Sequence, residues 1–343
     1  MFKTHYLFLL VLLALTCLSS GCAENKSGNN KDEAKLNNPV LIGDETTLLL
    51  EDLKENGDYV NSNVYPSLIK ASIVHESIGQ NNLVIDIRSE NQYSDGHIEG
   101  AINRKFEELP GYFENEITPF KFDKIILVCE DGQVSSYTAS LLRLMGYGNV
   151  YAMRWGMSAW NDTYSKQQWL NNVSAKYESQ LEKSTNEHPP AIGMPELNTG
   201  MSTGEEIGGA MFRKLFEEGS APAVITSDEL FSSPLDYFVI NLERKDKYEN
   251  GHVPGAVRYK PKATLGFPRE MATIPSDKTV VVYCGTGHNS GFAVAYLRAF
   301  GYDARMLKYG NNGFMYDKML KEKSLLSWLP FTSELVNDFE TVE

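Results

Sequence analysis

Cysteine and histidine are both scarce in this chain of 343 residues. Its four cysteines are too few to staple a fold of this length with disulfides. The six histidines are scattered, and none stands at zinc-ligand spacing from a cysteine. The sequence therefore predicts no metal site, and nothing in it indicates a cofactor.

Positive charge is also in short supply, because 32 lysines and arginines face 45 aspartates and glutamates, for a net charge of −13. A protein that binds nucleic acid needs a basic face that releases counterions from phosphate, so we expect no nucleic-acid partner. Hydrophobic residues make up 42% of the chain, which is enough for a buried core. The length predicts about two domains.

The apolar run near the N-terminus is short. It extends roughly over residues 6–18, follows Lys3, and is shorter than the ~20 apolar residues that cross a bilayer comfortably. Small residues at 19–21 precede Cys22. A positive start, a short apolar run and a small-residue cleavage site predict a secretory signal peptide over residues 1–22.

The end of this signal is similar to a bacterial lipobox, in which the cysteine becomes acylated, although Leu18 lies one place further out than in the usual pattern. We therefore expect lipidation at Cys22 and an exported, membrane-anchored protein of the cell envelope, on its periplasmic or extracellular face. A plainly secreted protein and a retained membrane anchor remain alternatives. The following segment is rich in Asn, Lys and Glu, and we predict a polar tether over residues 23–61.

An internal repeat organises the rest of the chain. Gly96-His-Ile-Glu-Gly-Ala101 recurs as Gly251-His-Val-Pro-Gly-Ala256, and Cys129 and Cys284 lie at the same offset of 155 residues. A fixed offset without net insertion indicates a duplicated domain. We place the first copy at 62–163 and the second at 218–325, with a linker over 164–217, helical in its first part, and a C-terminal tail over 326–343.

Both copies show the same order of expected elements. Apolar strand-type runs cover 83–87, 124–129 and 149–153 in the first copy, and 237–242, 279–284 and 304–307 in the second. Helical spacing covers 135–147 and 289–302, and each of these helices ends at a glycine, Gly146 or Gly301. Nearly continuous apolar strands alternating with helices predict an α/β fold with two mostly parallel sheets, each flanked by helices.

The chemistry is expected where each cysteine ends a strand and begins a short loop into a helix. Ligands of open α/β sheets bind at the carboxyl ends of the strands. A loop into a helix start directs backbone N–H groups and the helix dipole at one point, which favours a thiolate or an anionic persulfide. Cys284 and Cys129 are thus the candidate nucleophiles. The alternative, a buried structural cysteine, stays open.

These motifs together resemble the rhodanese family of sulfurtransferases. The resemblance rests on Asp-x-Arg at 86–88, the two Gly-His-x-x-Gly-Ala turns, the two cysteine loops and a later glycine, Gly156 or Gly310. Cys-Gly-Thr-Gly at 284–287 resembles the mercaptopyruvate-type loop. The resemblance implies a ping-pong reaction in which the cysteine takes sulfane sulfur from a small anionic donor, such as thiosulfate or mercaptopyruvate, and passes the persulfide sulfur to a thiophilic acceptor.

The resemblance also implies the residues around the substrate. In the first copy they are Gly132 of the cysteine loop and the Asp-x-Arg pair, Asp86 and Arg88. In the second copy they are the loop residues Gly285, Thr286, Gly287, His288 and Asn289, with Arg244 as a substitute cation. His288 is either a donor to the substrate or an ordinary surface residue. We expect Asp86 and Arg88 to orient the scaffold rather than react. We also expect His97 and His252 to fix their turns by hydrogen bonds, and Trp155 and Trp160 to be packing residues.

The two copies depart from the family pattern in different ways. The place where the loop often carries an arginine holds Val134 in the first copy and Asn289 in the second. The first loop also carries Glu130 and Asp131, and like charge disfavours a thiolate and an anionic donor.

The second copy has a neutral loop but shows Asn241 and Glu243 where the first has Asp-x-Arg, so we predict that Arg244 supplies the missing cation. We rank Cys284 first as nucleophile and Cys129 second.

Two other functions compete with sulfur transfer. Cysteine phosphatases need an arginine after five intervening positions to clamp phosphate, and Ser135 and Ser290 stand there instead. A non-enzymatic tandem module, tethered at the membrane for partner binding or sulfur carriage, is the stronger rival. The physiological donor and acceptor, the oligomeric state and the arrangement of the two domains stay open.

Overall fold

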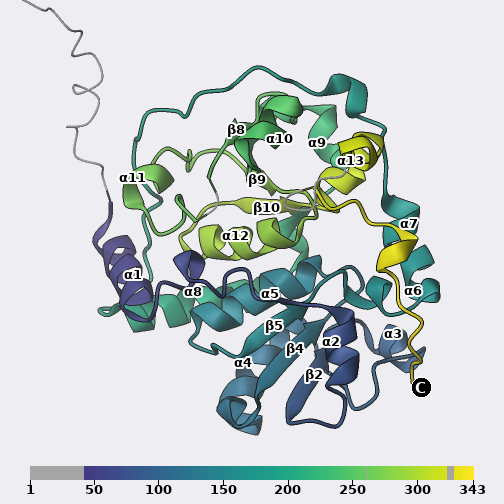
Figure 1. Cartoon of the computed structure of the whole chain (residues 1–343). Coiled ribbons are helices and arrows are strands. Elements are labelled where there is room, and N and C mark those ends of the chain that lie inside the picture. Colours follow the sequence, from purple (N-terminus) through teal and green to yellow (C-terminus); the bar gives the residue numbers. More distant parts are fainter. Residues whose placement is uncertain (1–41, 261, 323–327) are drawn as a thin grey trace, which may run out of the picture. The chain divides into compact units, whose positions relative to one another are not determined.

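Each copy of the repeat forms a five-stranded parallel sheet in the computed structural model, which describes residues 42–260, 262–322 and 328–343 (Figure 1). The first sheet has the order β1-β5-β4-β2-β3, and the second has the matching order β6-β10-β9-β7-β8. The identical order confirms the duplicated α/β fold. The signal peptide, Cys22 and residues 23–41 of the predicted tether lie outside the described residues.

The expected strands are confirmed to within a residue or two, and each sheet has two further short strands. The first sheet contains β1 Leu68–Ile69, β2 Asn82–Asp86, β3 Ile102–Asn103, β4 Lys124–Val128 and β5 Val150–Met153. The second contains β6 Val224–Ile225, β7 Phe238–Asn241, β8 Val257–Arg258, β9 Val280–Tyr283 and β10 Ala304–Leu307.

Helices cover both faces of the sheets. In the first copy these are α2 Ala71–Glu76, α3 Glu90–Ser94, α4 Leu109–Gly111 and α5 Gln133–Leu144, while α6 Asp162–Gln167 begins at its end and α7 Trp169–Asn172 lies in the first part of the predicted linker. In the second they are α9 Ser227–Ser232, α10 Lys245–Asn250, α11 Pro268–Met271, α12 His288–Ala299 and α13 Tyr316–Glu322. Along β4, Ile125 and Leu127 join the core that contains α5, whereas Ile126 and Val128 join the core that contains α2. This alternation explains why β4 is apolar over residues 125–128.

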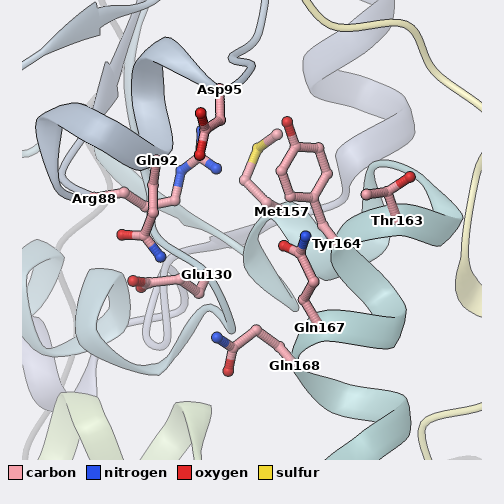
Figure 2. A pocket seen from close by; sticks show the side chains of 9 residues that line it. All are labelled: Arg88, Gln92, Asp95, Glu130, Met157, Thr163, Tyr164, Gln167 and Gln168. Atoms are coloured by element: carbon pink, nitrogen blue, oxygen red, sulfur yellow. The ribbon is translucent and has the colours of Figure 1, made fainter.

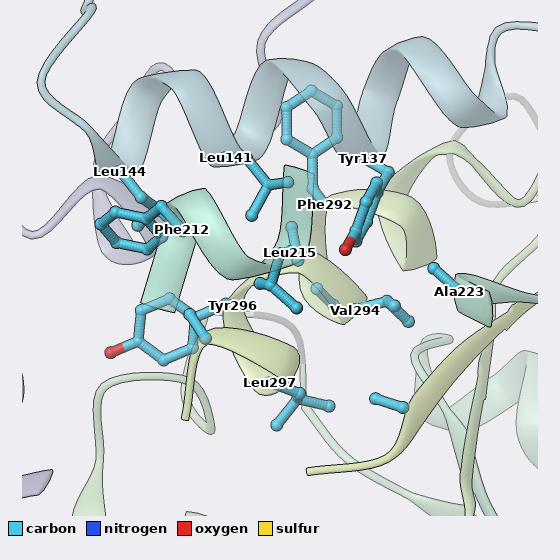
Figure 3. Packing of buried hydrophobic residues seen from close by; sticks show 14 of the residues in the cluster. Tyr137, Leu141, Leu144, Phe212, Leu215, Ala223, Phe292, Val294, Tyr296 and Leu297 are labelled. Carbon is cyan, nitrogen blue, oxygen red and sulfur yellow. The ribbon is translucent and has the colours of Figure 1, made fainter. Parts of the chain in front are cut away.

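The two domains share one hydrophobic core, in which α5 packs against α12 (Figures 1 and 3). Figure 3 shows Tyr137 and Leu141 of α5 meeting Phe292 and Val294 of α12. The helices approach closely, since a Cβ on Gly291 would lie 3.0 Å from the carbonyl oxygen of Gln133. The cysteine loops, which lead into these helices, are therefore held in a fixed relation.

The predicted tether and linker are corrected in part. Residues Asp44–Glu55 form α1, which packs against α8, Gly204–Glu218, and its Leu49 is fully buried. The Glu45 carboxylate also accepts hydrogen bonds from the backbone N–H groups of Thr199 and Gly200. The tether prediction is therefore wrong from Asp44 onward, and the linker prediction is wrong for α8, whose apolar face belongs to the shared core.

The predicted C-terminal tail is also corrected, because residues 328–343 pack along the protein. Trp328 and Phe331 are fully buried. Further on, the Trp160 indole donates to the carbonyl oxygen of Glu340 at 2.9 Å, and Val342 pairs with His97 in an antiparallel bridge. This segment thus returns to the first domain. Within the described part of the chain, no helix has the length and apolar character needed to span a bilayer.

Two side chains cross between the domains at equivalent places. Gln133 accepts a hydrogen bond from Tyr309 N at 2.7 Å and donates one to Leu307 O at 3.2 Å. Its counterpart His288 accepts a hydrogen bond through Nε2 from Trp155 N at 3.0 Å. These reciprocal contacts fix each cysteine loop against the last strand of the other domain.

His288 is consequently neither a surface residue nor a donor to substrate. It is fully buried, and because Nε2 accepts from Trp155 N, Nδ1 carries the proton and donates to Thr286 Oγ1 at 2.8 Å. Both ring nitrogens are used within the fold. The substrate-binding prediction for His288 is therefore wrong, because the ring serves the contact between the domains.

Acid should destabilise the protein through His288. Burial, together with the nearby charge of Arg154, lowers the pKa of His288 from 6.5 to about 3. Between these values the unfolded chain binds a proton that the folded chain does not, so the free energy of unfolding falls as the pH falls. His288→Gln, which copies Gln133, removes this titration. We expect the variant to lose about 2 kcal/mol less than the wild type between pH 7 and pH 5.

Urea denaturation at both pH values measures this difference. The reverse change, Gln133→His, places an ionisable ring at the equivalent position and should steepen the pH dependence. An unchanged slope in His288→Gln would contradict the assignment.

Candidate active site

The two cysteines occupy equivalent cradles at the carboxyl ends of β4 and β9. The sulfur of Cys129 accepts hydrogen bonds from Gly132 N at 3.1 Å and Ser135 N at 3.3 Å. The sulfur of Cys284 is held by the backbone N–H groups of its own loop, at Thr286, Gly287 and Ser290. Each cradle can therefore stabilise a negative charge on sulfur, as the loop-to-helix pattern predicts.

A glycine after the last strand of each sheet packs closely against the backbone carbonyl of the cysteine, and the residue after the glycine donates a hydrogen bond to this carbonyl. Met157 N donates to Cys129 O at 2.9 Å, and Asn311 N donates to Cys284 O at 3.1 Å. A Cβ on Gly156 or Gly310 would lie only 2.2 Å from the corresponding cysteine carbonyl oxygen, and both glycines have positive φ. This close approach requires a glycine in the motif.

Acidic groups dominate the surroundings of Cys129. Its thiol is 1% exposed and lies 3.6 Å from Asp131 Oδ1 and 3.4 Å from Ser135 Oγ. Burial, then the charges of Asp131 and Glu130, raise the pKa of this thiol far above its ordinary value. The free protein thus holds Cys129 as a thiol, in the direction expected from the acidic loop.

Cys284 has a less acidic environment. Burial and the charge of Glu243 raise the pKa of its thiol, while the N–H groups of the loop act in the opposite direction. A single carboxylate acts on Cys284, where two act on Cys129. The comparison favours Cys284 as the more easily ionised cysteine.

The Asp-x-Arg pair lies beside the first cradle as a buried ion pair. Arg88 Nη2 is 2.6 Å from Asp86 Oδ2 and donates to Gly96 O at 2.8 Å. The arginine thereby ties the strand end to the Gly-His turn. This geometry agrees with an orienting role.

The turn histidines lie where the sequence analysis expects them. His97 Nδ1 lies 3.0 Å from Tyr93 O, and His252 Nδ1 lies 2.8 Å from Tyr248 O. Each ring stacks on the same tyrosine that it contacts through the backbone. These contacts fix the turns.

Arg244 is not found in the role predicted for it. It lies at the exposed start of α10, where its Nε is 3.0 Å from Asp246 Oδ1. In the second copy, Asn241 Oδ1 accepts from Glu243 N at 2.9 Å, so the ion pair of the first copy is replaced by a local hydrogen bond. The structure does not support Arg244 as the cation of the second cradle.

The remaining loop residues surround Cys284 in different ways. Gly285 is buried, and its carbonyl oxygen accepts from Asn312 Nδ2 at 2.8 Å. Asn289 is half-buried and lines a narrow cavity of about 30 Å³, together with Tyr65 of the first domain. Asn289 is thus placed at a cavity that both domains line.

A larger cavity of about 360 Å³ opens at Cys129. Residues of both domains line it, among them Arg88, Glu130 and Gln168 of the first domain and Lys308 of the second. A smaller cavity of about 100 Å³ continues from it, and Figure 2 shows Glu130 and Gln92 facing the side chains of Gln168 and Tyr164 there. A cavity lined by residues of both domains therefore adjoins the more acidic cysteine.

Two basic residues near the cysteines are not among the site residues predicted from the sequence. Lys308 follows β10 and lines the cavity at Cys129, whereas Arg154 follows β5 and interacts electrostatically with Cys284. Each of them directly follows the last strand of its copy. Two basic residues at matching positions of a repeat are the sequence feature that could have identified them.

Parts of the chain are similar to known proteins. A tRNA uridine(34) hydroxylase of Prochlorococcus marinus is 28% identical over 156 residues, which cover 41% of this chain and 48% of the relative. A thiosulfate sulfurtransferase, GlpE, of Shewanella oneidensis is 34% identical over 80 residues, which cover 23% of this chain and 75% of the relative. The chain thus spans about half the length of the hydroxylase relative.

Among solved structures, a thiosulfate sulfurtransferase from Pseudomonas aeruginosa is 18% identical, with a TM-score of 0.28 over 78% of this chain and 48% of that one. Residues 70–163 and 228–317, more than half of the chain, each match the family described as Rhodanese-like domain. The chain therefore belongs to the rhodanese-like domain family and carries two such domains in tandem.

Proposed function

We propose that this protein is a sulfurtransferase that moves sulfane sulfur from a small anionic donor, such as thiosulfate or mercaptopyruvate, to a thiophilic acceptor. The observation that carries the proposal is the convergence of backbone N–H groups on each cysteine sulfur. Such a cradle favours the thiolate and, after transfer, the anionic outer sulfur of a persulfide. The thiosulfate sulfurtransferase among the relatives supports the same reaction class.

With thiosulfate, the reaction has two displacement steps. The cysteine thiolate attacks the outer sulfur, the S–S bond breaks, and sulfite leaves with the electron pair of that bond. The product is a cysteine persulfide anion. The acceptor, cyanide in a test reaction, then attacks the terminal sulfur through carbon, so that thiocyanate leaves and the thiolate is regenerated.

Cys284 is the main nucleophile in this proposal. Three N–H groups oppose the effect of burial on its thiol, and its loop carries no carboxylate. At Cys129, Asp131 is itself buried and accepts from Gln133 N at 2.9 Å, so it is fixed beside the sulfur. An anionic donor approaching Cys129 would meet that fixed charge.

Replacing Cys284 should abolish turnover. We expect Cys284→Ser to reduce thiocyanate formation from thiosulfate or mercaptopyruvate and cyanide by more than about 10²-fold, because the nucleophile is removed. Cys129→Ser is the matched control and should keep most of the activity. The measurement is steady-state thiocyanate release, with intact mass to detect one added sulfur on each protein.

The contrary results are distinct. Full activity in the double variant would overturn both site assignments. Absence of turnover with every donor, combined with no gain of one sulfur on either cysteine, would overturn the enzyme itself and favour a non-catalytic tandem module. The non-catalytic function remains the alternative because both thiols are buried and their pKa values are raised.

Removing the charge of Asp131 should activate Cys129. Asp131→Asn keeps an oxygen that accepts from Gln133 N but loses the carboxylate beside the sulfur. The pKa of the Cys129 thiol should fall, and its alkylation by iodoacetamide at pH 7.5 should rise about tenfold. Alkylation at Cys284 in the same protein is the internal control, and an unchanged rate at Cys129 would contradict the role of Asp131.

We also propose that the protein is exported and anchored through a lipid on Cys22, as the signal-like sequence over residues 1–22 indicates. Palmitate labelling in a bacterial host should mark the wild type, and Cys22→Ala should lose the label. Equal labelling of both proteins would overturn the anchor, and an unlabelled but processed wild type would favour a plainly secreted form.

A further inference from the structure

A basic residue follows the last strand of each sheet, at equivalent positions of the repeat. Arg154 comes directly after β5, and Lys308 comes directly after β10. The next residues, Trp155 and Tyr309, both have positive φ, 68° and 63°, so the chain turns in the same way after each cation. Both cations are half-buried.

Lys308 belongs to the second domain but reaches the cysteine of the first. It lines the cavity of about 360 Å³ that also contains Cys129. Hydrogen bonds of the neighbouring residues Leu307 and Tyr309 to Gln133 fix the chain on both sides of Lys308 against the Cys129 loop. Burial raises the pKa of Asp131, and the hydrogen bond from Gln133 N and the charge of Lys308 act in the opposite direction.

Arg154 occupies the reciprocal place. The backbone N–H of the next residue, Trp155, donates to His288, four residues beyond Cys284. Arg154 is thereby fixed beside the second cysteine loop, and its charge interacts with Cys284 and lowers the pKa of His288. Among the residues that the structure describes, Arg154 makes no ion pair with a carboxylate, so its guanidinium is available to another anion.

We propose that the two domains exchange cations, so that Arg154 of the first domain completes the anion site over Cys284 and Lys308 of the second completes the one over Cys129. The anion is the ionised cysteine sulfur, its persulfide, or the charged group of a small sulfur donor. The proposal rests on the sulfurtransferase function for its purpose. It also explains how Val134 and Asn289 can stand where the loop often has an arginine.

The charges that face each sulfur make the two sites unequal. Cys284 interacts electrostatically with Glu243 of its own domain and with Arg154 and Tyr65 of the first domain. Cys129 interacts electrostatically with Glu130 and Asp131 and with Tyr309 of the second domain, whose Lys308 lines the same cavity. One cation balances one carboxylate at Cys284 but opposes two at Cys129. The exchange therefore benefits Cys284 more.

Exchanging each cation for a neutral side chain tests the proposal in the full-length protein. Alkylation by iodoacetamide, followed at each cysteine by peptide mass spectrometry over pH 6–11, gives the midpoint of a thiol that ionises within this range. Because the pKa of Cys129 is raised far above its ordinary value, a rise of one unit in its midpoint is measured instead as an alkylation about tenfold slower at fixed pH. The accessibility of a thiol changes its alkylation rate by the same factor at every pH, so it does not change the midpoint. Arg154→Gln should raise the midpoint of Cys284 by about one unit, and so slow its alkylation about tenfold at neutral pH. The midpoint of Cys129 should stay unchanged.

Lys308→Gln is the matched variant and should do the opposite, raising the midpoint of Cys129 and leaving that of Cys284. The conservative variants Arg154→Lys and Lys308→Arg keep the charge and should keep the wild-type midpoints, which also shows that the interface tolerates the change. No shift in either neutral variant, or the same shift at both cysteines, would overturn the exchange. A wild type without turnover would overturn the proposed function but would leave this comparison of midpoints intact.

Discussion

The packing of α5 against α12 is the contact on which the rest of the structure depends. Gly291 allows the two helices to approach closely, and the Ser140 hydroxyl of α5 donates to the Phe292 carbonyl oxygen of α12 at 3.0 Å. Because each helix begins at a cysteine loop, this packing also sets the position of each loop against the other domain. The cross-domain contacts of Gln133 and His288 are possible only in this arrangement.

Much of the fold could be predicted because its signals are local. The runs over residues 125–128 of β4 and 280–282 of β9 are apolar and rich in β-branched residues, which marks strands buried on both faces. The fixed offset of the repeat then predicts two equal sheets, and the order of strands confirms it. The cysteine cradles follow from the same local pattern, since a strand end, a short loop and a helix start are adjacent in sequence.

The rest depends on contacts between segments far apart in sequence. Nothing near His288 indicates that its ring will accept a hydrogen bond from Trp155, 133 positions earlier. The segment that contains α1 is polar in its local sequence pattern, whereas Leu49 and Leu53 are buried by packing against α8, which lies far away in sequence. Arg244 was predicted as the missing cation because it lies near Glu243 in sequence, whereas Arg154 reaches Cys284 from the other domain.

The reciprocal interface also gives a physical reason why the two copies could diverge in different ways. The first copy keeps the Asp86–Arg88 ion pair but has two carboxylates in its loop, whereas the second has a neutral loop but no such pair. If each cysteine site depended only on its own domain, the acidic loop would affect only the site of the first domain, and the missing ion pair only the site of the second. Because the strand ends of one domain fix the loop of the other, the first domain supports Cys284 through Trp155 whatever happens to the charge around Cys129. A reactive site at Cys284 therefore requires the structure of both domains, because its loop is held by a residue of the first domain.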